Sequence, residues 1–372
     1  QYPRPAPVGT DALFLSHAHL DHSGMAPLLS RLPHTRVVGT AVTAAVTDLL
    51  TRDSLKVARL EGYLEPYSAH DIRALQQRFD LVDRHGTYRM KGIEVDLTSA
   101  GHIPGATMFR FRGPKDVLFS GDVQSIATHL VKPAEPVDAD ILFLESTYAG
   151  REHPDRADTE RRLIDRIREV VARGGKAIIP AFAVGRAQEV AMAIAHAGFE
   201  VYLDGMARKV NSIYRAAPEY LLDPRGFRRA LDALNIVEHA TERKKALREA
   251  DAVISTGGML DGGPVLFYIG ELYRDPKSAI FLTGYQVEGS NGRQLVEQGT
   301  LTIDGVTVRP ECEVEAFDFS SHAGHSELVD LVKRTGAADV VLMHGDRREE
   351  LAKSLREFTR VHLPENGLRF SL

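Results

Sequence analysis

Short apolar runs separated by polar turns recur through the first 150 residues and predict a region rich in strands. The predicted strands are Ala12–Leu15, Thr35–Val38, Tyr88–Met90, Ile93–Leu97, Met108–Phe111, Val117–Phe119 and Ile141–Leu144. Lys91-Gly92 separates two of these runs by two residues, which is typical of a tight hairpin. Helical spacing of apolar residues predicts two helices, at Ala41–Leu50 and Ser68–Phe79.

From about Tyr148 onward, the pattern changes to strands that alternate with helices. Helices are predicted at 158–173, 187–195 and 208–214, and strands at 177–179, 200–203 and 252–255. Such alternation over about 100 residues implies a parallel sheet covered by helices, which is a second α/β domain. After Phe317 the chain returns to residues of the kind that could bind a metal, so this domain is expected to be an insertion in the first.

The six residues His17-Ala18-His19-Leu20-Asp21-His22 carry three imidazoles and one carboxylate directly after the first predicted strand. Residues at these spacings cannot all share one helix face, because a helix repeats every 3.6 residues or so. They can converge from a tight loop at the end of a strand, where functional groups are often displayed. Imidazole and carboxylate ligands together suit zinc and similar divalent metals, so the sequence predicts a metal site.

The composition of the 372-residue chain is that of an ordinary globular enzyme, with 43% hydrophobic and 26% charged residues. No apolar stretch of the sequence approaches the roughly 18 residues of a membrane span, so we expect no membrane partner. Cys312 is the only cysteine, which excludes an intrachain disulfide and fits a cytoplasmic protein. The net charge of −5 argues against a uniformly basic surface, although a bound metal could make one groove locally positive.

The motif His-x-His-x-Asp-His at residues 17–22 resembles that of the metallo-β-lactamase superfamily. The resemblance implies an α/β fold, the αβ/βα sandwich with a one- or two-metal site, and metal-assisted hydrolysis. It leaves the substrate open, because the superfamily includes lactamases, glyoxalase II, lactonases and nucleases. Its domains usually begin with two or more strands ahead of the metal loop, whereas only sixteen residues precede His17. We therefore expect that the first strands are missing here, a shorter natural variant being the alternative.

Three further residues match the later metal motifs of the superfamily. His102 lies in a glycine-rich turn, Asp122 ends a Ser-Gly-Asp stretch, and His344 follows the apolar run Val340–Met343. The resemblance implies one zinc ion held by His17, His19, His102 and Asp122, and a second held by Asp21, His22, His344 and the shared Asp122. Two zinc ions in this arrangement would share a hydroxide, which is available as a nucleophile near neutral pH.

The predicted insertion narrows the substrate class. Lactamases and glyoxalase II are not interrupted in this way, whereas β-CASP nucleases are, and three more β-CASP motifs match Glu145, His322 and His344. A histidine at the last of these positions accompanies RNA substrates in that family, and an aliphatic residue accompanies DNA. The resemblance therefore implies a zinc-dependent ribonuclease for RNA maturation, 3′-end processing or decay. Its domains would be a first metallo-β-lactamase part (1–149), an inserted β-CASP domain (150–318) and a C-terminal metallo-β-lactamase part (319–372).

His322 and Glu145 are expected to act in catalysis, together with Asp21 at the metals. The 3′ oxygen that leaves an RNA phosphodiester is strongly basic, and His322 is the candidate for protonating it. Glu145 would orient the imidazole and favour its protonated form. The alternative is that His322 caps the following helix and Glu145 only closes a turn.

Three glycine-rich stretches of the insertion, residues 180–189, 257–264 and 284–293, also resemble β-CASP sequences. Backbone N–H groups in such turns suit a phosphate backbone, and Arg186, Ser290 and Arg293 are candidates for RNA contacts. The alternative is that these glycines only permit tight turns with positive φ.

Other functions stay open from the sequence alone. The same superfamily includes DNA nucleases and small-molecule hydrolases, and polyadenylation complexes contain inactive scaffold subunits. Such scaffolds typically lose zinc ligands, whereas all seven candidates are present here. Relatives often form homodimers, but no interface can be recognised. The sequence does not distinguish internal cleavage from degradation that begins at a 5′ end.

Overall fold

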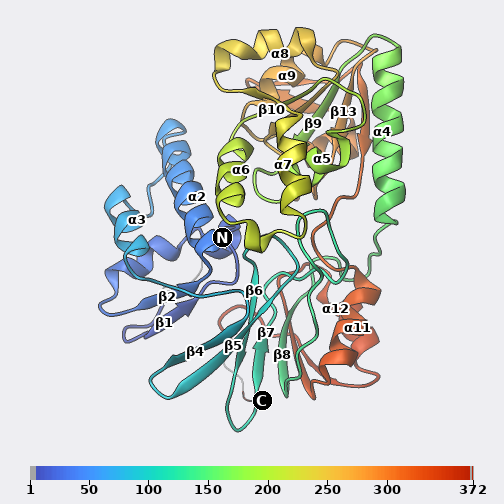
Figure 1. The fold of residues 1–372 in the computed structure, drawn as a ribbon. Helices are drawn as coiled ribbons and strands as arrows, with labels where there is room; N and C mark the ends of the chain where they lie inside the picture. Colours follow the sequence, from blue (N-terminus) through green and yellow to red (C-terminus); the bar gives the residue numbers. More distant parts are fainter. Residues whose placement is uncertain (1–5, 369–370, 372) are drawn as a thin grey trace. The chain divides into compact units, whose positions relative to one another are not determined.

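The computed structural model describes residues 6–368 and 371, and these divide into two units (Figure 1). Unit 1 comprises the described residues within 1–127, 131–152 and 322–372, and unit 2 comprises 128–130 and 153–321. The chain thus leaves unit 1 after Glu152 and returns to it at His322, so most of unit 2 is an insertion. Both crossings lie a few residues beyond the boundaries expected from the sequence.

The larger sheet of unit 1 has seven strands in the order β18-β17-β8-β7-β6-β5-β4. They are β4 (Gly86–Met90), β5 (Ile93–Ser99), β6 (Thr107–Phe111), β7 (Val117–Phe119), β8 (Ile141–Glu145), β17 (Asp339–Met343) and β18 (Arg360–His362). The strands from β4 to β7 are antiparallel neighbours, and those from β7 to β18 are parallel. Lys91 and Gly92 have φ values of 48° and 79°, as a two-residue hairpin turn requires, which confirms the predicted hairpin.

A second sheet of unit 1 consists of three parallel strands, β1 (Ala12–Phe14), β2 (Arg36–Gly39) and β3 (Phe79–Leu81). The helices of this unit are α1 (Leu20–Ser23), α2 (Ala41–Leu60), α3 (Ala69–Gln76), α11 (His325–Thr335) and α12 (Arg348–Leu355), with a 3₁₀ turn at Ala26–Arg31. The prediction for α2 was ten residues short, because its charged second half still buries Leu55. The prediction for α3 was too long, because Phe79 packs with Leu15 as part of a strand.

Unit 2 is built on the predicted parallel sheet, with six strands in the order β11-β10-β12-β9-β13-β16. They are β9 (Ala177–Ala181), β10 (Val201–Asp204), β11 (Asn235–Val237), β12 (Ala252–Thr256), β13 (Ala279–Leu282) and β16 (Glu313–Ala316). A separate hairpin pairs β14 (Leu301–Ile303) with β15 (Val306–Val308). The strands β9 and β12 are buried along their whole length, which explains why they read as continuous apolar runs.

The helices of unit 2 are α4 (Arg156–Ala172), α5 (Arg186–Ile194), α6 (Ala207–Ala216), α7 (Pro224–Asp232), α8 (Arg243–Glu249), α9 (Val265–Leu272) and α10 (Asn291–Gln298), with 3₁₀ turns at Pro218–Tyr220 and Ala240–Glu242. In α4, Leu163, Ile167 and Val170 are fully buried while the rest is strongly charged, so one stripe of the helix faces the core. The short segment 128–130 joins this unit because the buried Glu189 carboxylate accepts hydrogen bonds from two of its backbone N–H groups.

Within residues 6–368 and 371, none of the helices combines the length and the apolar character that crossing a bilayer would need.

Candidate active site

The seven predicted metal ligands come together in unit 1, although they are spread over more than 300 residues of sequence. His17 and His19 lie between β1 and α1, whereas Asp21 and His22 lie in the single turn of α1 itself. His102 follows β5, Asp122 follows β7 and His344 follows β17. The histidine-rich motif is therefore a strand end continued by one helical turn, not a loop throughout.

The first group of ligand atoms surrounds one point. The separations are 3.1 Å from His19 Nδ1 to His17 Nε2, 3.1 Å from His19 Nδ1 to His102 Nε2, 3.4 Å from Asp122 Oδ2 to His17 Nε2, and 3.8 Å from Asp122 Oδ2 to His102 Nε2. Ligand atoms of a tetrahedral zinc site lie about 3.3–3.6 Å apart when each is about 2.0–2.2 Å from the metal. The first group could therefore hold one zinc ion with little rearrangement.

A second group of candidate ligand atoms also contacts Asp122. Its separations are 3.1 Å from Asp21 Oδ2 to His344 Nε2, 3.6 Å from Asp21 Oδ2 to His22 Nε2, and 3.4 Å from Asp122 Oδ2 to His22 Nε2. The same oxygen of Asp122 thus belongs to both groups. In addition, His22 Nε2 and Asp122 Oδ1 are buried and make no hydrogen bond within the described part of the chain. Buried polar atoms left in this way fit residues that bind a cation.

Burial and charge set the protonation of the first group. Burial, helped by neighbouring histidines, lowers the pKa of His17 and His102 and brings the pKa of His19 to about 3. These imidazoles are therefore neutral near pH 7, which is the form that binds metals. Burial by itself raises the pKa of Asp122, but the facing imidazoles outweigh it and the pKa falls well below its usual value. The carboxylate is charged.

His322 and Glu145 form a separate pair beside this cluster. Glu145 is fully buried, and its Oε1 accepts hydrogen bonds from His322 Nδ1 at 2.8 Å and from the N–H of Val123 at 2.9 Å. Its Oε2 accepts one from the N–H of Thr147. Because three donors occupy this carboxylate, it is better suited to orienting His322 than to binding a metal. Burial lowers the pKa of His322, but the charges of Glu145 and Asp122 outweigh it and raise the pKa above its usual value.

The structure does not support a capping role for His322. Helix α11 begins at His325, its N-cap is Gly324, and the Glu327 carboxylate accepts a hydrogen bond from the N–H of Gly324. The imidazole of His322 instead lies with Nε2 4.0 Å from Asp122 Oδ2. His325, which matched no motif, has a structural role, because Nδ1 accepts a hydrogen bond from the N–H of Gly150 and Nε2 lies 3.0 Å from Ser354 Oγ.

Three polar residues behind this cluster were not identified from the sequence. Ser16 Oγ lies 3.2 Å from His17 Nδ1, and Thr147 Oγ1 lies 3.1 Å from His344 Nδ1. The buried amide of Gln124 donates a hydrogen bond to the carbonyl oxygen of His322 at 2.9 Å. Each residue is one or two positions from a predicted site residue, which was the only available signal.

The three glycine-rich stretches of unit 2 follow the adjacent strands β9, β12 and β13 and contact one another. Gln286 donates a hydrogen bond to the carbonyl oxygen of Gly258, and the N–H of Gly292 donates one to Met259. A Cβ added at Gly258 or Gly284 would press on Phe182. The glycines therefore have a packing function at the carboxyl edge of the sheet.

The three candidate RNA contacts in these stretches differ in accessibility. Arg186 is buried and donates a hydrogen bond to the carbonyl oxygen of Thr283. Ser290 is buried as the N-cap of α10, where its hydroxyl accepts a hydrogen bond from the N–H of Arg293. The guanidinium of Arg293 is partly exposed and pairs with Glu297 one turn later. Of the three, only Arg293 presents its charge at the surface.

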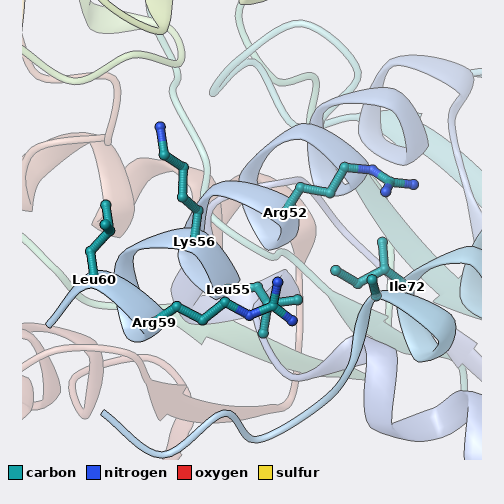
Figure 2. A pocket seen from close by; sticks show the side chains of 7 residues that line it. Arg52, Leu55, Lys56, Arg59, Leu60 and Ile72 are labelled. Carbon is teal, nitrogen blue, oxygen red and sulfur yellow. The ribbon is translucent and has the colours of Figure 1, made fainter. Parts of the chain in front are cut away.

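A groove with a volume of about 370 Å³ lies on unit 1 between α2 and α3. Figure 2 shows three cationic residues, Arg52, Lys56 and Arg59, projecting from α2 near the apolar Leu55 and Ile72. Asp48 pairs with the first arginine at 2.7 Å and Glu65 with the second at 2.9 Å. These carboxylates compensate much of the positive charge, so we assign no phosphate site to this groove.

Comparison with known proteins finds similarity to metal-dependent hydrolases over most of the chain. Residues 1–172 match the model of a beta-lactamase superfamily domain, residues 187–295 that of the Beta-Casp domain, and residues 307–364 that of a Zn-dependent metallo-hydrolase RNA specificity domain. The Beta-Casp segment lies within unit 2, and the other two segments lie on either side of it in the sequence.

Several archaeal proteins are similar over most of the chain. A probable RNase of Methanocaldococcus jannaschii is 36% identical, with 95% of this chain and 85% of that protein covered. An RNase of Saccharolobus solfataricus is also 36% identical, with coverages of 96% and 74%. The transcription termination factor FttA of Thermococcus kodakarensis is 34% identical over 93% of this chain, which corresponds to 59% of that longer protein.

Proposed function

Because the chain belongs to the β-CASP family of the metallo-β-lactamase superfamily, we propose that it is a zinc-dependent ribonuclease that hydrolyses RNA phosphodiester bonds. One observation carries the proposal: Asp122 Oδ2 lies 3.4 Å from both His17 Nε2 and His22 Nε2. A single carboxylate oxygen shared by two imidazole groups in this way fits the bridge of a two-metal centre.

The first group of residues would hold one zinc ion and the second group the other. The first group consists of His17, His19, His102 and Asp122, and the second of Asp21, His22, His344 and the shared Asp122. When bound, two such ions activate a water molecule and neutralise charge that develops on the phosphate. The neutral first-group imidazoles and the charged bridging carboxylate are already in the required protonation states.

His322 would supply the proton that the leaving 3′ oxygen needs. The charges of Glu145 and Asp122 raise the pKa of His322 and favour its protonated form. The buried Glu145 carboxylate fixes Nδ1, which leaves Nε2 on the side of Asp122. Positioned general acids typically contribute about 10²–10⁴ in rate.

RNA is favoured over the other substrates by three considerations. The C-terminal segment matches a model described as an RNA specificity domain, and two of the archaeal relatives are named as RNases. His344 is present at the position where an aliphatic residue would indicate DNA. A scaffold without activity is disfavoured, because every candidate ligand lies in the cluster.

The proposal is tested with purified protein in two measurements. Metal analysis should find two zinc ions per chain, and end-labelled RNA should be cleaved while single-stranded DNA and a chromogenic lactam are not. Dialysis against a chelator should abolish cleavage, and added zinc should restore it. Failure to cleave RNA by a preparation that contains both zinc ions would refute the ribonuclease assignment. The sizes of the labelled products distinguish internal cleavage from degradation starting at the 5′ end.

The role of His322 needs its own substrate. His322→Ala should retain both zinc ions but lose about 10²–10⁴ in turnover. An RNA whose leaving 3′ oxygen is replaced by sulfur needs no proton, so the variant should recover most of its rate on it. His70→Ala, which alters an exposed histidine of α3, is the matched control and should behave like the wild type. Equal slowness on both substrates would exclude the general acid role.

A homodimer, suggested by family resemblance, and a cytoplasmic location, which the single cysteine fits, complete the proposal. Light scattering of the purified chain tests the first, and fractionation of cells tests the second.

A further inference from the structure

The backbone at His344 is held in an unusual conformation by the end of strand β8. His344 has φ +50°, a left-handed value that few residues other than glycine adopt. The N–H of Ser146 donates a hydrogen bond to the carbonyl oxygen of His344 at 3.2 Å, and its hydroxyl donates one to Met343 at 2.7 Å. These two hydrogen bonds from Ser146 fix the turn that contains His344.

Thr147 contacts both the backbone and the imidazole ring of His344. Its hydroxyl donates a hydrogen bond to the carbonyl oxygen of His344 at 3.3 Å and lies 3.1 Å from Nδ1 of the same residue. Because the hydroxyl can donate its own proton to the carbonyl oxygen, its oxygen can at the same time accept the proton of ring Nδ1. The second neighbour of Nδ1 is Asp122 Oδ1, at 3.4 Å, and it is also an acceptor. Both neighbours thus favour a ring with its proton on Nδ1.

A ring protonated on Nδ1 has its free lone pair on Nε2. That atom lies 3.1 Å from Asp21 Oδ2, on the side where the second group of ligand atoms converges. Asp21 Oδ2 can accept a proton from Nε2, and a bound cation would take the place of that proton between the two atoms, whereas the proton on Nδ1 would stay. The choice of tautomer therefore decides whether His344 can bind a metal there.

Packing restrains His344 less than the ligands of the first group, because the second group is partly exposed to solvent. The side chain of His344 is 33% exposed and that of Asp21 is 59% exposed, whereas His17 and Asp122 are nearly inaccessible. An exposed imidazole can rotate or change tautomer freely unless a hydrogen bond restrains it.

We propose that Thr147 positions His344 for the second metal ion, by fixing both the ring orientation and the proton on Nδ1. The inference rests on the proposed two-zinc centre and adds to it a residue that touches neither metal nor substrate. Hydrogen-bond partners behind a metal-binding histidine typically contribute about 10–100-fold to metal affinity.

The test is a zinc titration against a competing chelator, without RNA. Thr147→Val keeps the shape of the side chain but removes the acceptor, so the weaker of the two zinc ions should bind about 10–100-fold less tightly while the tighter one is unchanged. Thr147→Ser retains the hydroxyl and should restore wild-type affinity.

Thr159→Val is the matched control. It removes a hydroxyl that donates to the carbonyl oxygen of Asp155 in unit 2, so any loss of stability common to such substitutions should appear without a change in zinc binding. Thermal unfolding of each metal-free variant separates stability from affinity.

The outcomes distinguish this inference from the proposed function. If the wild type binds two zinc ions and Thr147→Val binds both with unchanged affinity, Thr147 does not position His344. The same conclusion follows if Thr147→Ser is as weak as Thr147→Val. If the wild type itself binds fewer than two zinc ions, the proposed centre is wrong and this inference falls with it.

Discussion

The two groups of candidate ligands that meet at Asp122 lie in very different surroundings. In the first group, the side chains of His17 and His102 are each 1% exposed. In the second, His22 is 18%, His344 33% and Asp21 59% exposed. The comparison indicates two ways of building a metal site, because packing can hold buried ligands whereas exposed ones depend on hydrogen bonds.

The backbone shows how tightly the first group is packed. Gly101, just before His102, has φ +68°, and a Cβ there would collide with the backbone of Gln124 and Ala134. Gly121, just before Asp122, has φ +56° and lies close to Ser16. At both positions glycine is required by the conformation and by the neighbouring chain.

The largest effect on both groups is expected from Asp122→Ala. The substitution removes the only oxygen common to the two groups, so two cations would face each other without the shared negative charge. Zinc content should fall below one ion per chain and RNA cleavage should be lost. Asp116→Ala is the control, because Asp116 lies just before strand β7 whereas Asp122 follows that strand, and this variant should keep both ions. Two zinc ions at full occupancy in Asp122→Ala would show that Asp122 is not the bridge.

The next largest effect is expected from a substitution that removes a ligand from the second group only. Asp21→Ala should release the ion of the exposed group and leave one zinc ion per chain. Limited chelation of the wild type should produce the same one-zinc state. Chelation should proceed in two steps, because exposed ligands exchange with solvent more readily than buried ones. Release of both ions in one step, or complete loss of zinc from Asp21→Ala, would contradict the division into two groups.

Gly101→Ala tests the dependence of the buried group on packing. Left-handed strain of about 1–2 kcal/mol and overpacking of about 1–3 kcal/mol predict a loss of about 2–5 kcal/mol in the free energy of unfolding. The displacement of His102 should also weaken the binding of the tighter zinc ion. Gly62 has φ +71° but open space around an added Cβ. Gly62→Ala should therefore cost only the left-handed strain and leave zinc binding intact. Chemical denaturation of the two metal-free variants measures the loss in the free energy of unfolding of each. Equal losses in the two variants would mean that packing at Gly101 is unimportant.

The smallest effect on either group is expected from Arg293→Ala in unit 2. Zinc content should not change, because the residue belongs to a different unit from the ligands. If the exposed guanidinium contacts an RNA phosphate, RNA binding should weaken and the slope of log affinity against log salt should decrease by about 1. An unchanged slope would remove Arg293 from the RNA-binding residues.

The sequence by itself determined much of this protein. Apolar periodicity identified most strands of unit 1 and the hairpin at Lys91-Gly92, because these patterns depend on residues close together in the chain. In unit 2 it identified β9, β10 and β12 and the parallel type of the sheet, but it missed β11, β13 and β16. It was less accurate where burial of one residue decides the end of a helix, as at Leu55 in α2 and Phe79 after α3. The candidate ligands were recognisable because their residue types follow strands, at positions where side chains can converge.

The tertiary structure decided what those residues can do. Which oxygen of Asp122 lies in both groups, which imidazoles are neutral, and which guanidinium reaches the surface all depend on atoms brought together by the order of strands in a sheet. Arg186 and Ser290 were candidates for RNA contacts in the sequence, but both are buried and make hydrogen bonds to backbone groups. Thr147 carried no signal of its own, because its function arises only where the ends of β8 and β17 lie side by side. Local sequence specifies local structure, whereas the exposure and hydrogen bonding of each side chain depend on its neighbours in space.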